Sequence, residues 1–159
     1  FNSIMIVKSS DRGRSWNLMT GNLPDKHLCW RIIQDHLDPK LFFLGTEFGI
    51  FTTLDAGQEW HKLSGGLPTI SFRDLEIQRR ENDLVAASFG RSFYVLDDYS
   101  LLRNVTADSL QSDLHLYPVR RTFWYVQENK LGGTKGSQGD SLSGARGNIE
   151  ALRTLSKPR

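Results

Sequence analysis

The chain of 159 residues has one cysteine and no long apolar run. Cys29 has no second thiol with which to form an intrachain disulfide, and no paired Cys or His spacing typical of a zinc site is present. We therefore expect Cys29 to be a small buried apolar residue, and we expect no metal and no cofactor. The longest apolar stretches, such as residues 41–44, are far too short to cross a bilayer, so no membrane span is predicted.

An excess of positive charge is also absent from most of the chain. The formal net charge is +2, but residues 130–159 hold six basic and two acidic side chains, which leaves −2 for residues 1–129. A nucleic-acid surface needs Lys and Arg gathered on one folded face, so we expect no nucleic-acid partner. No charged-then-apolar leader precedes Phe1, and the chain begins within a predicted strand, as an excised piece would.

What the sequence does contain is an internal repeat. Two octets, residues 9–16 and 53–60, have one layout and lie 44 residues apart, and the Gly-Asn-Leu-Pro of residues 21–24 recurs as Gly-Gly-Leu-Pro at the same spacing. A third, decayed copy keeps a Phe-Gly and a Leu-Asp pair in residues 89–97 but lacks the Gly and Trp of the octet. The matched residues are Ser9, Asp11, Gly13 and Trp16 in the first octet and Thr53, Asp55, Gly57 and Trp60 in the second.

The residue types of the octet have local physical reasons. Glycine adopts the positive φ of a tight turn, and the aspartate accepts hydrogen bonds from turn amides. The tryptophan begins the returning strand and is predicted to bury its ring between neighbouring repeats. A catalytic role for Asp11 and Asp55 is disfavoured, because a carboxylate held by turn amides has a lowered pKa and is a poor acid or base. We interpret both octets as structural.

The pattern Ser/Thr-x-Asp-x-Gly-x-Ser/Thr-Trp resembles the Asp box of the BNR repeat family, found in sialidases, sortilin-type domains and related β-propellers. Glu59 departs from it at the second hydroxyl position. Residues 41–51 and 72–99 look like bacterial proteins labelled BNR-repeat glycosyl hydrolases or sortilin-like propellers, and the resemblance covers about residues 4–125. It implies a larger parent of about seven to ten blades, usually exported. The segment after Ser141 has no such resemblance.

The repeat length predicts an all-β fold, a partial β-propeller of four-stranded antiparallel blades. Residues 1–103 would form about two and a half blades, short of the at least four of a closed ring. The favoured explanation is a fragment completed by further blades of a parent protein; association of copies through blade edges, or misassembly, are alternatives. The expected strands are residues 4–8, 15–19, 30–35, 41–45, 48–53, 59–63, 72–77, 84–88 and 92–96.

The rest of the chain is predicted to leave the propeller. Residues 104–126 hold two expected strands, at 112–117 and 121–126. Residues 127–159 are rich in glycine and basic residues, and we expect a mobile tail with one short helix at 148–156.

A ligand-binding rim is expected opposite the octet turns. The turns between the second and third strands carry Glu47 and Arg91, and the connections entering the first strands carry the remaining candidates. An ordinary surface role is the alternative for each candidate, and His27 has no partners at metal spacing. The candidate rim residues are Glu47, Arg91, Arg73, Asp74, His27 and Trp30.

The sequence favours binding over catalysis. A sialidase needs an arginine cluster and a Tyr-Glu nucleophile pair, and other glycosidases need two carboxyl groups about 5 to 10 Å apart. Neither set can be assembled, since Asp97 and Asp98 are adjacent and would face opposite sides of a strand. We expect a non-catalytic propeller module for a protein, peptide or glycan ligand, inactive as an isolated chain; a fragment of a glycoside hydrolase is the alternative.

Overall fold

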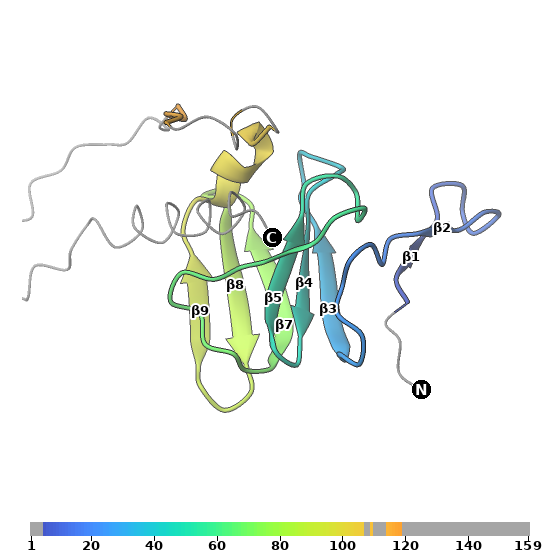
Figure 1. Ribbon diagram of the computed structural model, residues 1–159. Helices are drawn as coiled ribbons and strands as arrows, with labels where there is room; N and C mark the ends of the chain where they lie inside the picture. Colours follow the sequence, from blue (N-terminus) through green and yellow to red (C-terminus); the bar gives the residue numbers. More distant parts are fainter. Residues whose placement is uncertain (1–4, 107–108, 110–113, 119–159) are drawn as a thin grey trace, which may run out of the picture.

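The computed structural model describes residues 5–106, 109 and 114–118, and these residues form an all-β fold with one short 3-10 helix, η1 (Tyr99–Asn104) (Figure 1). All strand pairs are antiparallel. No helix among the described residues is long and apolar enough to cross a membrane. The strands are β1 (Val7–Lys8), β2 (Asn17–Leu18), β3 (Cys29–Gln34), β4 (Phe42–Thr46), β5 (Gly49–Thr53), β6 (His61–Lys62), β7 (Phe72–Gln78), β8 (Asp83–Ser88) and β9 (Phe93–Leu96).

The strands form three sheets in chain order: a hairpin β1-β2, a four-stranded sheet β3-β4-β5-β6 and a three-stranded sheet β7-β8-β9. Strands β4 and β5 are buried along their whole length, because one face packs against the β7–β9 sheet and the other against the segment after β2. Gly45 permits the close approach of the two larger sheets, since a Cβ there would lie 2.7 Å from the Phe72 carbonyl oxygen.

Strand positions follow the sequence closely. Strands β3 to β5 and β7 to β9 begin and end within one or two residues of the expected bounds. Strand β6 is shorter than the expected 59–63, and β1 is shorter than the expected 4–8. The prediction of a strand at 112–117 was wrong for its described part. Residues 114–117 pair with no described strand, and Leu114 and Leu116 are exposed. The strand expected at 121–126 and the helix expected at 148–156 lie outside the described residues.

Trp60 joins the first repeat to the second. Its ring is 3% exposed and lies in an apolar cluster with Met19, Leu23, Phe42, Leu44 and Phe51. Its indole Nε1 donates a 2.8 Å hydrogen bond to the Met19 carbonyl oxygen. Asn22 completes the junction, because its side chain accepts from the Trp60 amide at 2.6 Å and donates to the Trp60 carbonyl at 3.1 Å.

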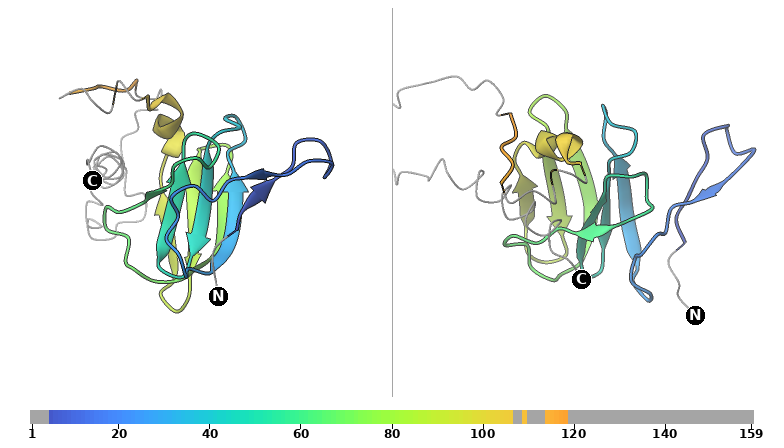
Figure 2. Two further views of the ribbon diagram at one scale, coloured as in Figure 1. Left: turned by 45° about the vertical axis from the view of Figure 1, so that its right-hand side comes forward. Right: turned by 45° about the horizontal axis from the view of Figure 1, so that its top comes forward.

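Trp16, the matching residue of the first octet, is not buried. The expectation that both tryptophans bury their rings was wrong for Trp16, which is 62% exposed. It stands on the β1-β2 hairpin, which projects away from the larger sheets in both views of Figure 2. Octets of matching layout therefore give a buried ring only where a neighbouring strand pair and the segment of residues 19–23 enclose it.

This difference makes the two tryptophans a matched pair for mutation. Trp60→Ala removes a fully enclosed ring and its hydrogen bond, and should lower the free energy of unfolding by about 3 to 5 kcal/mol. Trp16→Ala should change it by about 0.5 kcal/mol or less, because an exposed ring loses few contacts. Urea denaturation of both variants checks this, and equal losses would contradict the assignment of Trp60 as the junction.

Candidate functional site

The two octet turns share most of their hydrogen-bond pattern. In the first, the Asp11 carboxylate accepts the Ser15 amide at 2.8 Å and the Ser15 hydroxyl at 2.7 Å, and the Gly13 amide donates to the Ser9 hydroxyl at 2.7 Å. The hydrogen bonds from Ser15 hold the pKa of Asp11 at about 2, below its usual value. Gly13 has the positive φ of 86° that the turn requires, and Arg12 before it has a φ of 62°. This carboxylate closes a turn.

The second octet repeats this turn with one contact missing. Asp55 accepts the amides of Gln58 at 2.9 Å and Glu59 at 3.0 Å, and the Gly57 amide donates to the Thr53 hydroxyl at 2.9 Å. Gly57 has a φ of 90° and lies so near the first repeat that a Cβ would be 2.7 Å from Met19 Cβ. Where Ser15 donates a hydroxyl to Asp11, the second octet has Glu59, whose side chain has no hydroxyl to donate.

The far end of the two larger sheets holds the predicted rim. The β4–β5 and β8–β9 turns lie at the lower end in Figure 1, whereas the second octet turn and η1 lie at the upper end. Glu47 and Arg91 stand on these two lower turns, and the Glu47 amide donates to the Leu28 carbonyl oxygen at 3.1 Å. The two turns and the strand entries at Trp30 and Arg73 thus share one end of the fold.

Two equivalent β-bulges position Trp30 and Arg73. The pairing of β3 with β4 skips Trp30 between Cys29 and Arg31, and the pairing of β7 with β8 skips Arg73 between its neighbours. A bulged residue is freed from the ladder and its side chain is re-aimed. As a result the Arg73 guanidinium lies 3.7 Å from the centroid of the Trp30 ring and 4.8 Å from that of Phe89.

Arg73 and its neighbours form an exposed surface that we call the aromatic rim. Phe89 on the β8–β9 turn is 70% exposed and Trp30 is 38% exposed. Phe48 on the β4–β5 turn is also exposed, and its ring lies 4.8 Å from that of His27. The aromatic rim consists of Leu28, Trp30, Phe48, Arg73 and Phe89.

Three members of the aromatic rim were missed by the sequence reasoning, which singled out charged side chains. The signal was present, because Phe48-Gly49 and Phe89-Gly90 put the same aromatic residue on both exposed turns. Leu28, by contrast, carries no such signal.

The remaining predicted candidates have local roles. Asp74 pairs with Arg31 at 3.3 Å on an exposed surface. The His27 ring packs against Phe48 and Phe51, and among the described residues its buried Nδ1 has no hydrogen-bond partner. Cys29 is half-buried rather than fully buried, and burial raises the pKa of its thiol. In the part of the chain that the structure describes, no three His, Cys, Asp or Glu side chains gather as they would around a metal ion.

A buried ion pair, unforeseen in the sequence, lies at the opposite end. The Asp35 carboxylate has no exposed side-chain surface and accepts two 2.8 Å hydrogen bonds from the Arg103 guanidinium. The Tyr99 hydroxyl donates to it at 2.6 Å, and the amides of Leu37 and Asp38 donate at 3.2 and 2.8 Å. These contacts tie η1 to the β3–β4 loop, 68 residues earlier in the chain.

The environment of Asp35 keeps it ionised. Burial raises the pKa of this carboxyl, but the hydrogen bonds from Arg103, Tyr99 and the two amides outweigh burial and hold the pKa well below its usual range. Burial and the same carboxylate raise the pKa of Tyr99, so the phenol stays protonated and donates. A carboxylate whose lone pairs are all engaged is a structural anchor rather than an acid or base.

Removing the charge of Asp35 should therefore destabilise the end of the fold at which η1 packs. Asp35→Asn leaves the Arg103 guanidinium buried without its counter-charge, and should cost about 3 to 5 kcal/mol of unfolding free energy. Asp74→Asn, at the exposed pair, is the control and should cost about 1 kcal/mol or less.

The pH dependence gives a second readout of the Asp35 pair. The pKa of Asp35 is lower in the folded chain than in the unfolded chain. The stability that this carboxylate contributes is therefore fully present above the unfolded-state pKa, and it is lost as the pH falls toward the folded-state pKa. The difference in stability between the wild-type chain and Asp35→Asn should narrow from about pH 5 to about pH 2. A difference that is constant over this range in urea titrations would show that the charge is not the cause.

The second octet lacks a hydroxyl donor at Glu59, and supplying one should stabilise the chain. Glu59→Ser supplies the hydroxyl donor that Ser15 provides in the first octet and removes the negative charge of the Glu59 side chain. We expect a gain of about 0.5 to 1 kcal/mol, measured by urea denaturation. Glu59→Ala separates the two effects, because it removes the charge without adding the donor; equal stability of both variants would mean that the hydroxyl contributes nothing.

Comparison of the chain with protein-family models, with curated proteins and with solved structures finds no match.

Proposed function

We propose that this chain contributes blades to a β-propeller of the Asp-box type and acts as a non-catalytic module that binds a protein or peptide ligand. The 44-residue repeat and the two matching octet turns support the propeller architecture. Successive antiparallel sheets that pack face to face in chain order are also what consecutive blades require.

The observation that carries the binding function is the Arg73 guanidinium, which lies over the rings of two exposed aromatic residues. Stacking uses the flat faces of the guanidinium and leaves its N–H edges free to meet a carboxylate in bidentate geometry. Phe89 offers apolar surface beside the guanidinium, and Leu28 and Phe48 are further exposed apolar side chains at the same end of the fold. Exposed aromatic residues beside an arginine are the composition of protein-binding hot spots. The expected ligand is a peptide segment with an acidic residue next to an apolar one.

The glycoside hydrolase alternative has less support in the geometry. Asp74 is engaged with Arg31 and with the Leu75 amide at 2.9 Å, so it is a poor partner for Glu47 in a carboxyl pair. Asp97 and Asp98 follow β9 at the end of the fold away from the aromatic rim. The Asp98 carboxylate also accepts a hydrogen bond from the Ser100 hydroxyl at 2.5 Å.

Binding of immobilised peptides to the full chain tests the proposal. Peptides with an Asp or Glu beside Leu or Phe should bind, and their amide analogues with Asn or Gln should bind less. Arg73→Ala should weaken binding about tenfold, and Arg73→Lys should not restore it, because the ammonium group cannot stack and bind bidentately. Arg80→Ala is the matched control, because Arg80 is an exposed arginine on the turn between β7 and β8, at the opposite end of the sheets.

Two outcomes would contradict the proposal. Equal peptide binding by the wild-type chain and by Arg73→Ala would show that the aromatic rim does not bind the peptide. Hydrolysis of a glycan panel by the chain, lost in Glu47→Ala at unchanged stability, would instead favour the glycoside hydrolase.

A further inference from the structure

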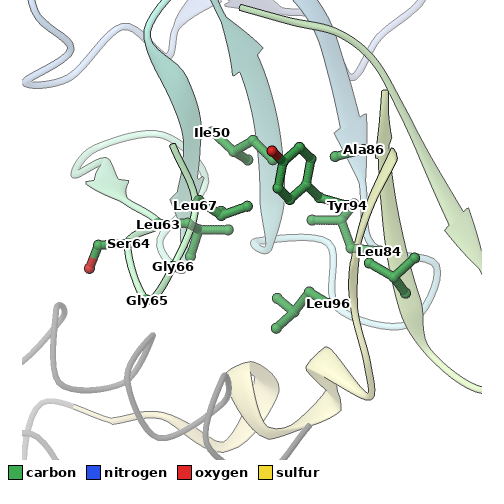
Figure 3. Close-up of a pocket in the computed structure, with 11 residues that line it drawn as sticks. Ile50, Leu63, Ser64, Gly65, Gly66, Leu67, Leu84, Ala86, Tyr94 and Leu96 are labelled. Atoms are coloured by element: carbon green, nitrogen blue, oxygen red, sulfur yellow. The ribbon is translucent and has the colours of Figure 1, made fainter. Parts of the chain in front are cut away.

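Two cavities beside the larger sheets differ in character. The cavity between the loop after β6 and strand β9 is lined mainly by apolar side chains, as Figure 3 shows for Leu67, Tyr94 and Leu96. A second cavity, of about 240 Å³, lies between β3 and β7. Its lining is mostly polar and includes charged side chains of both signs, so it can select a ligand by charge.

The two strands that border the second cavity give it an apolar floor. Strands β3 and β7 are the first strands of the two larger sheets and lie side by side. Ile33 and Ile77 stand 44 positions apart in the sequence, and both line the cavity while packing against the core between the sheets. The core behind these two side chains therefore holds the floor in place.

Glu76 and Arg79 bring opposite charges to the margin of this cavity. Both residues line the cavity and both are exposed. They are three positions apart, on β7 and on the turn that follows it, yet neither side chain forms an ion pair or a hydrogen bond with the described residues. An anionic and a cationic group thus border the same space without neutralising each other.

The other arginines near this cavity are already paired. The Arg80 guanidinium lies 3.1 Å from the Glu81 carboxylate, and Arg80 is not among the residues that line the cavity. Arg31 does line the cavity, but its guanidinium pairs with the Asp74 carboxylate at 3.3 Å. Arg79 is therefore the arginine of this group that is best placed to bind an added carboxylate.

A ligand that matches this lining carries one negative and one positive group. A carboxylate can accept two parallel hydrogen bonds from the Arg79 guanidinium, and an ammonium group can donate to the Glu76 carboxylate. An apolar side chain on the same ligand would cover Ile33 and Ile77. The volume of about 240 Å³ is below the roughly 300 to 1,000 Å³ of sites for drug-sized ligands, which limits the ligand to a small molecule.

We propose that the cavity between β3 and β7 binds a free α-amino acid with an apolar side chain. The Arg79 guanidinium binds its carboxylate, Glu76 binds its ammonium group, and the two isoleucines contact its side chain. The cavity shares no residue with the aromatic rim, and the proposal does not depend on the function proposed there.

Titration of the isotope-labelled full chain with leucine, followed by NMR of the backbone amides, measures this binding. Amide signals of residues 31–36 and 76–79 should shift and saturate. N-acetyl-leucine lacks the positive charge and leucinamide lacks the carboxylate, so each should bind about tenfold more weakly than leucine because each loses one charged contact. Glycine should also bind more weakly than leucine, because it has no side chain to cover the floor.

Two protein variants assign the two charges. Arg79→Ala should remove the preference for leucine over leucinamide, and Glu76→Gln should remove the preference for leucine over N-acetyl-leucine. Arg80→Ala is the matched control and should keep both preferences, because Arg80 is the adjacent exposed arginine outside the cavity. All three side chains are exposed, so the thermal melts of the variants should match that of the wild-type chain.

Equal binding of leucine and its two derivatives would overturn the proposal. Preferences that survive both Arg79→Ala and Glu76→Gln would overturn it as well, since they would show that these two side chains do not contact the ligand. A leucine titration that leaves the signals of residues 31–36 and 76–79 unchanged would contradict the site itself.

Discussion

The enclosure of one indole ring holds the two repeats of this chain together. Trp60 comes from the end of the second octet, yet most of its environment lies in the first repeat and in strands β4 and β5. Its N–H is satisfied by the Met19 carbonyl oxygen, so the ring contributes its full apolar area without an unpaired donor. Gly57 is required at the same junction because Met19 leaves no room for a side chain.

A second constraint fixes the last described helical turn. The Asp35–Arg103 pair is excluded from water, and its stability depends on every lone pair of the carboxylate being engaged. Tyr99 adds both a hydrogen bond and a ring that packs edge-on to Phe43 at 5.0 Å. The two junctions differ in kind, since one depends on apolar burial and the other on buried charge.

These structural anchors and the exposed candidates for binding are separated in space. The second octet turn and the Asp35 pair lie at one end of the larger sheets, and the aromatic rim lies at the other. The two bulges at Trp30 and Arg73 lie only on the rim side. Substitutions in the rim can therefore alter binding without loosening either junction, and this separation is what makes the proposed recognition site testable.

The sequence by itself determined the repeat, the octet turns and most strand positions, because each depends on residues within a few positions of one another. Glycine with positive φ, aspartate facing turn amides and short β-rich runs are local features, and so is the departure at Glu59. Only the tertiary structure decided that Trp60 is buried and Trp16 exposed, that Arg73 stacks on Trp30, and that Asp35 meets Arg103. These contacts join residues that are 41 to 68 positions apart, and no local pattern records which distant side chain will enclose a ring or neutralise a charge.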